Sequence, residues 1–114
     1  MAHKYFAKKS VVDGIVFPSK AEARRYGELK LLERAGEIEN LRLQPRFELM
    51  AGVVLRGRKK PPLRFTADFS YNLRGSGELV VEDVKGGRAT TTDAYRMRIH
   101  MMKHVHDIDV TEVG

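Results

Sequence analysis

Hydrophobic and polar residues follow two different periods along this chain, and the changes of period predict where strands and helices lie. Residues 10–17 have short apolar runs on both sides of Asp13 and Gly14. An Asp-Gly pair favours a tight turn between two strands. We therefore expect residues 10–17 to form a small β-hairpin.

A helical period begins at Ser19. This residue is a suitable N-cap, and Glu22 stands three residues later, at the spacing of a capping box. Gly36 is a natural stop. Between the two ends, charged residues alternate with an apolar stripe formed by Tyr26, Leu29 and Leu32. The pattern is typical of a helix with one side in water.

Strand-like segments fill most of the remaining chain. The predicted elements are, in order, a strand at 41–50, a basic loop at 56–62, strands at 64–71 and 79–85, a helix at 90–104 and a strand at 107–113. Pro45 places the first of these strands at a sheet edge or a bulge. Thr92 is the expected cap of the second helix, whose inner face carries Tyr95, Ile99 and Met102. We expect an α/β fold in which helices flank a central mixed β-sheet, with an N-terminal β-hairpin.

Two aspartates occupy neighbouring predicted strands. Asp68 lies on the polar face of its strand, and the other face carries Phe65, Ala67, Phe69 and Tyr71. If Gly75 and Ser76 form a two-residue turn, paired residues have numbers that sum to 151, and Asp68 lies opposite Asp83. A longer turn would shift this register. Opposed residues have Cβ atoms roughly 5 Å apart, and two ionised carboxylates that close are a ready cation site.

Lys85 stands two residues after Asp83 on the second of these strands. Side chains two residues apart share a face of a strand, so both lie on the face of Val81, and Glu82 points to the other face. A carboxylate on an apolar face is unfavourable unless a partner compensates its charge. A bound cation is such a partner, and the neighbouring ammonium suits chemistry on a phosphate.

Composition limits the class of protein. The chain has 114 residues, 42% of them hydrophobic, which suits one domain, 1–114, with a modest core. There is no cysteine, so disulfides and thiolate metal sites are excluded, and the chain suits a reducing cytoplasm. No apolar run is long enough for a membrane span, and residues 1–9 look like a loose basic tail without a signal-peptide core. We expect a cytoplasmic protein without membrane contact.

The charge is strongly positive. The net charge is +6 and the pI about 9.8, which favours a polyanionic partner such as nucleic acid. If the two aspartates and the lysine act on a nucleic-acid phosphate, the basic segments become candidate phosphate contacts. The candidates are Lys8, Lys9, Arg58, Lys59, Lys60 and Arg88.

The order of these acids resembles that of the PD-(D/E)XK nuclease superfamily. In that superfamily a helix acid, here Glu22, precedes a strand acid, here Asp68, and a D-x-K unit, here Asp83 and Lys85. More narrowly, the chain resembles small phage-encoded Holliday junction resolvases and phage-type endonuclease I. The resemblance runs from about residue 11 to residue 113 and is carried by residues 17–26, 43–47, 66–69 and 81–86. It implies a restriction-endonuclease-like αβββαβ core.

The resemblance also implies a role for each residue. Asp68, Asp83 and the main-chain carbonyl of Val84 bind the catalytic magnesium, for which manganese is able to substitute. Glu22 completes the metal site, although its place three residues after the N-cap also fits a purely structural capping box. Glu28 and Glu33, at the margins of the same apolar stripe, are the other helix acids that could complete it. Lys85 positions or activates the attacking water, or stabilises charge on the phosphate.

Two positions depart from the superfamily pattern, and one further residue matches it. Ala67 stands where a proline is usual, and Asp83 stands where glutamate is commoner. Gln44 stands where related phage and transposon nucleases carry a glutamine before a proline, and it is a candidate DNA contact.

Two other groups of residues have ordinary structural explanations. His100 and His104 have the spacing of helical metal ligands, but no accompanying motif supports a site, and we expect them to be solvated. Met97, Met101 and Met102 are expected to fill the core.

The function that we expect is a magnesium-dependent endodeoxyribonuclease, a phosphodiester hydrolase that cuts four-way or branched DNA as a Holliday junction resolvase in DNA recombination. Symmetric cutting of a junction needs two active sites, so we expect a homodimer. The resemblance implies a phage protein that acts in the host cytoplasm. The alternatives are a nicking, transposon-end or restriction-like nuclease, and a DNA-binding module without catalysis.

Overall fold

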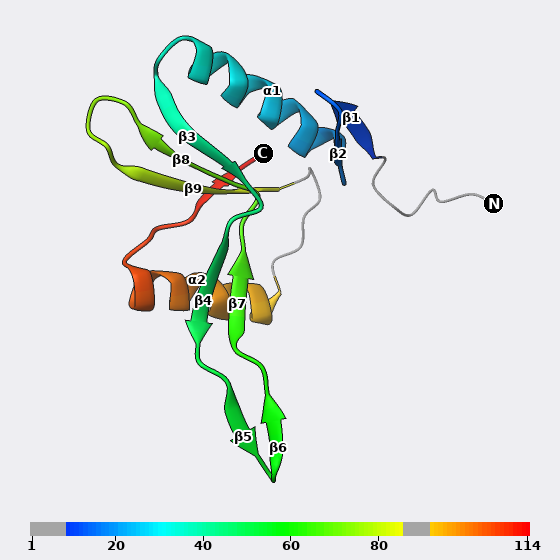
Figure 1. Ribbon diagram of the computed structural model, residues 1–114, viewed down its shortest axis with the longest axis vertical. Helices are drawn as coiled ribbons and strands as arrows, with labels where there is room; N and C mark the ends of the chain where they lie inside the picture. Colours follow the sequence, from blue (N-terminus) through cyan, green and yellow to red (C-terminus); the bar gives the residue numbers. More distant parts are fainter. Residues whose placement is uncertain (1–8, 86–91) are drawn as a thin grey trace, which may run out of the picture.

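The computed structural model describes residues 9–85 and 92–114, whose arrangement is shown in Figure 1. The helices are α1 (Lys20–Arg34) and α2 (Asp93–His106). The strands are β1 (Ser10–Val12), β2 (Ile15–Phe17), β3 (Ile38–Leu43), β4 (Arg46–Met50), β5 (Val53–Leu55), β6 (Arg58–Lys60), β7 (Leu63–Thr66), β8 (Phe69–Leu73), β9 (Leu79–Val84) and β10 (Thr111–Val113). Lys8 and Arg88, two of the candidate DNA contacts, lie outside the described residues.

A four-stranded sheet forms the centre of the molecule, in the order β10-β9-β8-β3. The strand β10 runs parallel to β9, and the other neighbouring pairs are antiparallel. The expectation of an α/β fold with a mixed sheet is therefore confirmed. Within the part of the chain that the structure describes, neither helix is long and apolar enough to cross a membrane.

The hairpin of β8 and β9 has the predicted register but a different turn. Phe69 pairs with Glu82, so paired numbers sum to 151. However, Gly77 N–H donates to Leu73 O at 2.8 Å and Gly77 has a φ of 75°, so a four-residue loop, 74–77, closes the hairpin. The predicted two-residue turn is wrong. The register survives because both loops are centred on the same peptide bond.

The N-terminal hairpin and the first helix form as the local sequence predicts. Asp13 and Gly14 have φ angles of 52° and 75°, as the tight turn between β1 and β2 requires. Ser19 caps α1, and its side-chain oxygen accepts the Glu22 N–H at 3.1 Å. This helix and hairpin cover one face of the sheet (Figure 1) and form the first core, whose buried residues are Phe17, Ala23, Tyr26, Leu29, Ile38, Phe69 and Tyr71.

Two of the predicted strands are each broken in the middle, which corrects the sequence analysis. The segment 41–50 divides at Gln44, whose φ is 54°, into β3 and β4. The segment 64–71 divides into β7 and β8 next to Asp68. Gln44 N–H donates to Asp68 O, and Ala67 N–H donates to Pro45 O, each at 3.0 Å. At these bonds the chain leaves the central sheet, and β4 and β7 continue as a separate two-stranded ribbon.

The second helix packs on this ribbon and encloses a second core. Its buried residues are Leu49, Phe65, Ala67, Val81 and Met102. Thr92 caps α2 as predicted, because its hydroxyl accepts the Tyr95 N–H at 3.1 Å. Met101 packs against the same core. Met97 is 65% exposed, so its prediction as a core residue is wrong, because it lies on the helix face turned away from the sheet.

The predicted basic loop at 56–62 is instead part of a projecting β-ribbon. The strands β5 and β6 pair antiparallel, with Val53 opposite Lys60 and Leu55 opposite Arg58. Figure 1 shows this ribbon extending beyond β4 and β7, away from the rest of the molecule. Pairing with the aliphatic strand β5 gives the basic segment a strand conformation that its own residues do not favour.

Candidate metal and phosphate site

Asp68 lies where the chain passes from β7 to β8, beside the end of β9. Asp68 N–H donates to Glu82 O at 3.0 Å. Its carboxylate oxygen Oδ2 accepts the Val84 N–H at 2.6 Å. The paired register of β8 and β9 ends one residue away, at Phe69 and Glu82, and the two bonds hold Asp68 beside the end of β9, where its carboxyl group interacts with that of Asp83.

Asp83 lies on β9, and Lys85 directly follows the last residue of this strand. Lys85 Nζ is 2.9 Å from Asp83 Oδ2, and 16% of the aspartate side chain is exposed, so the pair stands at the margin of the solvent. The same ammonium lies 3.4 Å from the ring centroid of Tyr95 in a cation–π contact. The acid and the lysine predicted as one unit are therefore in contact.

Tyr95 is a site residue that the sequence analysis treated only as part of a helix face. Its hydroxyl donates to Glu112 Oε2 at 2.8 Å, which links α2 to β10. Burial and this hydrogen bond raise the pKa of Tyr95 well above its usual value, so the phenol stays protonated. No sequence signal pointed to Tyr95, because its contact with Lys85 joins segments that are only neighbours in space.

Glu22 lies in the first turn of α1, close enough to Asp68 and Asp83 for the charges to influence one another. Its carboxylate oxygen Oε2 is buried and has no hydrogen-bond partner among the described residues. Burial, followed by the charge of Asp83, raises the pKa of Glu22. Burial raises the pKa of Asp68 to about 7, and the charges of Glu22 and Asp83 act in the same direction, against the hydrogen bond from Val84.

Three carboxylates from three separate segments therefore influence one another across a partly buried space. Such crowding is unfavourable without a compensating positive charge. The unpartnered oxygen of Glu22 and the raised pKa of Asp68 both fit a divalent cation with oxygen ligands. In the part of the chain that is described, no three His, Cys, Asp or Glu side chains are already grouped closely enough to hold a metal ion together.

Glu82 points to the opposite face of β9, as the alternation predicted, and it has a separate role. It is 1% exposed. Arg25 of α1 donates to it through Nε at 2.8 Å and Nη2 at 2.6 Å, and the Tyr71 hydroxyl donates to the same carboxylate. This buried group ties the helix that carries Glu22 to the strand that carries Asp83.

The remaining predicted DNA contacts lie in three places. Gln44 is exposed next to Asp68, and the two residues border a hollow of about 220 Å³ together with the N-terminal hairpin. Lys9 is exposed just before β1. The other three, Arg58, Lys59 and Lys60, lie on β6, in the projecting ribbon rather than beside the acids.

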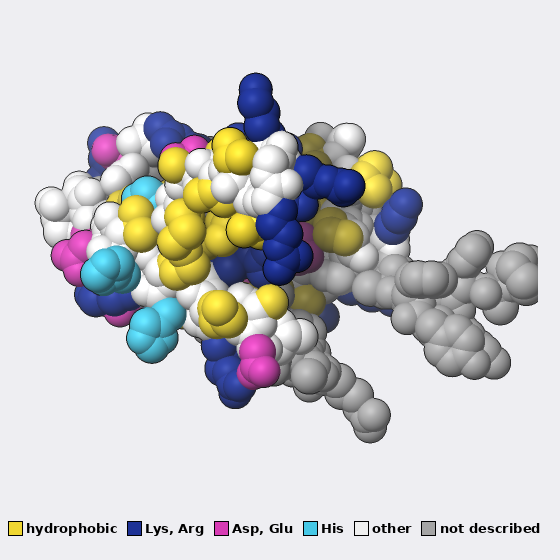
Figure 2. All heavy atoms as spheres, turned by 90° about the horizontal axis from the view of Figure 1, so that it is seen from below, with side chains coloured by type: hydrophobic (Ala, Val, Ile, Leu, Met, Phe, Trp, Pro, Cys, Tyr) yellow, Lys and Arg dark blue, Asp and Glu magenta, His cyan; other side chains and the backbone are white. Residues whose placement is uncertain are grey.

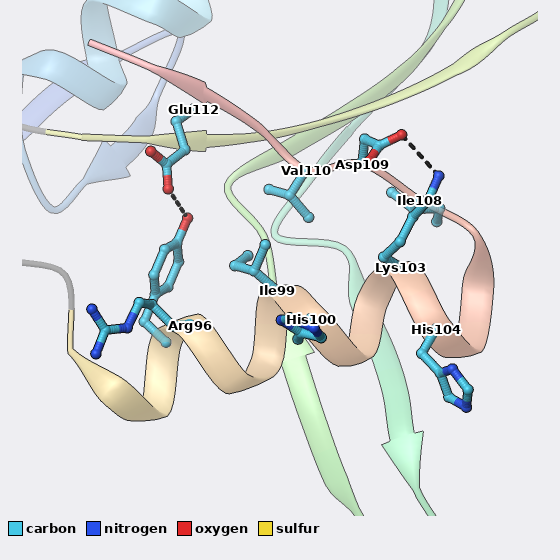
Figure 3. A pocket seen from close by; sticks show the side chains of 10 residues that line it. Arg96, Ile99, His100, Lys103, His104, Ile108, Asp109, Val110 and Glu112 are labelled. Carbon is cyan, nitrogen blue, oxygen red and sulfur yellow. Dashed lines mark hydrogen bonds and ion pairs between the residues drawn. The ribbon is translucent and has the colours of Figure 1, made fainter.

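A larger hollow of about 660 Å³ lies between α2 and residues 108–112 (Figure 3). Ile99 and Val110 point into it, and Arg96, His100 and Lys103 lie along the helix at its border. The Tyr95–Glu112 hydrogen bond closes one end. His100 and His104 are exposed here, as expected for solvated residues.

A divalent ion is expected to stabilise the folded protein, and this prediction tests the site without measuring activity. At one hundred times the dissociation constant, Mg²⁺ or Mn²⁺ adds about 2.7 kcal/mol to the free energy of unfolding. Asp68→Asn removes one of the crowded charges, so its Tm in chelator should equal or exceed that of the wild type, and the ion should no longer raise it. The measurement is the Tm of both proteins in chelator and in each ion.

Asp109→Asn is the matched control, because Asp109 is 83% exposed and pairs with Lys103 instead. This variant should keep the full metal-dependent rise in Tm. Equal rises in the Asp68→Asn variant and the wild type would contradict the assignment of Asp68 as a ligand.

Comparison with known proteins identifies a family but no characterised relative. A family described as "Protein of unknown function (DUF1064)" matches residues 2–113. Neither the curated proteins nor the solved structures contain a match to this chain. Because the family covers the two cores and all three acids, this chain belongs to the DUF1064 family.

Proposed function

We propose that this protein is a magnesium-dependent, structure-selective endodeoxyribonuclease with a restriction-endonuclease-like core, and that it cuts four-way DNA junctions. The observation that carries the proposal is that Asp68, at the passage from β7 to β8, lies within charge range of Glu22 of α1 and Asp83 of β9, with Lys85 in contact with Asp83. Carboxylates beside a lysine, in a chain with a net charge of +6, suit the hydrolysis of a nucleic-acid phosphodiester.

The residues of this chain have distinct parts in the reaction. Asp68 and Asp83, with Glu22 and the main-chain carbonyl of Val84, are the oxygen donors that would hold magnesium or manganese. The bound ion supplies a water of lowered pKa and neutralises charge on the scissile phosphate. Lys85 orients the attacking water or stabilises the charge that develops on the phosphate. The ring of Tyr95 holds the lysine ammonium in place.

The choice of branched DNA rests on the resemblance and on the size of the chain. A protein of 114 residues has little room for a separate sequence-reading domain, so the shape of the DNA has to supply much of the selectivity. Two cuts in opposing strands require two sites, and a homodimer with two-fold symmetry would present them.

The test compares cleavage of four-way junction, nicked, flap and linear duplex DNA by the purified protein with Mg²⁺. We expect the junction to be cut fastest and chelator to stop all cutting. Equal rates on linear duplex would exclude the resolvase assignment and favour a nicking, transposon-end or restriction-like nuclease. No cutting of any substrate would exclude the nuclease and leave a DNA-binding module.

A further inference from the structure

We propose that the projecting ribbon, residues 50–62, enters the major groove of duplex DNA beside the cut site and holds the substrate there. This ribbon is called the arm below. The inference rests on the proposed nuclease function and adds the element that binds the DNA duplex. It starts from an unusual surface, because every residue of β5 and β6 is exposed, including Val53, Val54 and Leu55 at 53–68%.

The positive charge of the arm favours a polyanion as its binding partner. From Met50 to Thr66 the chain contains five Lys or Arg residues and no Asp or Glu. Among the described residues no carboxylate pairs with the four cations of the tip, which are Arg56, Arg58, Lys59 and Lys60. Figure 2, which views the molecule from the tip of the arm, shows hydrophobic side chains bordered by Lys and Arg. Two such arms would repel each other, which disfavours a second copy as the partner.

The register distributes cations and aliphatic side chains over both faces of the arm. Paired residues share a face, so Lys60 and Arg58 lie beside Val53 and Leu55, and Lys59 lies beside Val54 on the other face. A major groove about 12 Å wide admits a two-stranded ribbon with phosphates on both sides, and the thymine methyl groups inside it take apolar contacts. The deep, narrow major groove of duplex RNA does not admit side chains.

The tip carries a backbone feature that fits a binding role. Arg56 and Gly57 have φ angles of 52° and 78°, as in a type I′ turn, in which Asn or Gly is the favoured first residue. An arginine in this left-handed conformation is unfavourable for folding. Arg56, Arg58 and Lys60 border a hollow at the tip, and their three positive charges would attract an anionic group there.

The two strands approach closely at the base of the arm. A Cβ atom at Gly52 would lie 2.6 Å from Lys60 O, so only glycine allows the two strands to approach there. Pro61 and Pro62 restrict the opposite strand. Below this point α2 anchors the ribbon, because Arg98 Nε donates to Arg64 O at 3.3 Å and His106 Nε2 lies 2.7 Å from Glu48 O.

The arm is also continuous with the segment that carries Asp68. Asp68 follows Arg58 by ten positions, and at about 3.3 Å per residue this segment spans at most roughly 33 Å. This length corresponds to about one turn of B-DNA, or roughly 10 base pairs. The arm therefore contacts the duplex within about 10 base pairs of the phosphate that is cut.

The experiment measures binding and cleavage as a function of duplex length. The arm variant is Arg56→Ala with Arg58→Ala. The control is Arg34→Ala with Arg74→Ala, which removes the same charge from exposed sites at the opposite end of the molecule. For equilibrium binding, the arm variant, the control and the otherwise unchanged protein each also carry Asp83→Asn, and their affinities are measured for DNA duplexes of about 6 to 24 base pairs. For cleavage, the same proteins without Asp83→Asn are assayed for KM and kcat on junctions with short and long branches.

The protein with an unchanged arm should bind duplexes longer than about 10 base pairs roughly ten- to hundredfold more tightly than shorter ones. The arm variant should lose most of this gain and show a raised KM with little change in kcat, and its affinity for duplex RNA should match that of the control. The control should keep the dependence on length.

Three results would overturn the inference. Equal length dependence in the arm variant and the control would exclude the arm as a DNA contact while leaving the nuclease assignment intact. Loss of a dimer in the arm variant alone, measured by light scattering, would make the arm a contact between copies. Cleavage and binding that are absent even from the wild type would contradict the proposed function itself, which the junction assay detects separately.

Discussion

Asp83→Asn is expected to reduce the rate of DNA cleavage roughly 10³-fold or more while the protein stays folded and binds DNA as before. The amide keeps the size of the side chain but loses the charge that holds a divalent ion. Metal ions supply several kcal/mol of stabilisation to the transition state of phosphoryl transfer, and each 1.36 kcal/mol changes the rate tenfold. The measurement is kcat and KM with Mg²⁺, together with the equilibrium Kd for the same DNA.

The stability of the Asp83→Asn variant shows whether Asp83 is a site residue or a structural one. Asp83 pairs with Lys85 at the margin of the solvent, and its charge also raises the pKa of both Glu22 and Asp68. The lost ion pair and the relieved repulsion oppose each other, so the Tm should change little. Asp109→Asn is again the control and should cut at the wild-type rate. Wild-type cleavage by the Asp83→Asn variant would contradict the proposed site.

The parts of the fold that short-range chemistry determines could be predicted from the sequence. The Ser19 cap and the Asp13-Gly14 turn depend on residues within a few positions of each other. The pairing that brings Asp68 beside Asp83 was also predicted correctly although the turn was wrong. A two-residue loop and a four-residue loop with the same centre leave the same residues paired. The predicted pairing therefore depended only on the position of the centre of the turn.

The break at Asp68 could not be predicted, because the alternation of the sequence continues through it. Phe65 and Ala67 belong to the core under α2, whereas Phe69 and Tyr71 belong to the core under α1. The local alternation assigned all four to one strand face. Which helix covers each pair depends on contacts between distant segments, and these are not visible in a local pattern.

The basic segment 56–62 illustrates the same limit on a larger scale. Arg, Lys and Gly have low intrinsic preference for strands, so a loop was the local prediction. The pairing of β6 with Val53–Leu55 decided the conformation instead. The roles of Tyr95 and Arg25 were missed for the same reason, since each contacts its acid or lysine only after the helices have packed.

Arg25→Met is expected to lower the free energy of unfolding by about 3–5 kcal/mol, because it leaves Glu82 buried without its cation. Glu82 is 1% exposed and accepts two hydrogen bonds from this guanidinium. The bond from the Tyr71 hydroxyl remains, but a neutral donor does not replace the lost charge. For a chain of this length the loss corresponds to a decrease in Tm of roughly 10–20 °C. Denaturant unfolding and thermal scans of the metal-free protein measure it.

Arg24→Met is the matched control, since Arg24 is exposed on the same helix, and its Tm should stay within a few degrees of the wild type. The double variant Arg25→Met with Glu82→Met should recover most of the lost stability, because a buried ion pair can often be replaced by apolar side chains of similar volume. It should also cut DNA within about tenfold of the wild-type rate, because Glu82 lies on the face of β9 opposite to Asp83 and binds no metal. Complete loss of cleavage in a folded double variant would mean that the wrong one of these two neighbouring acids has been assigned to the metal.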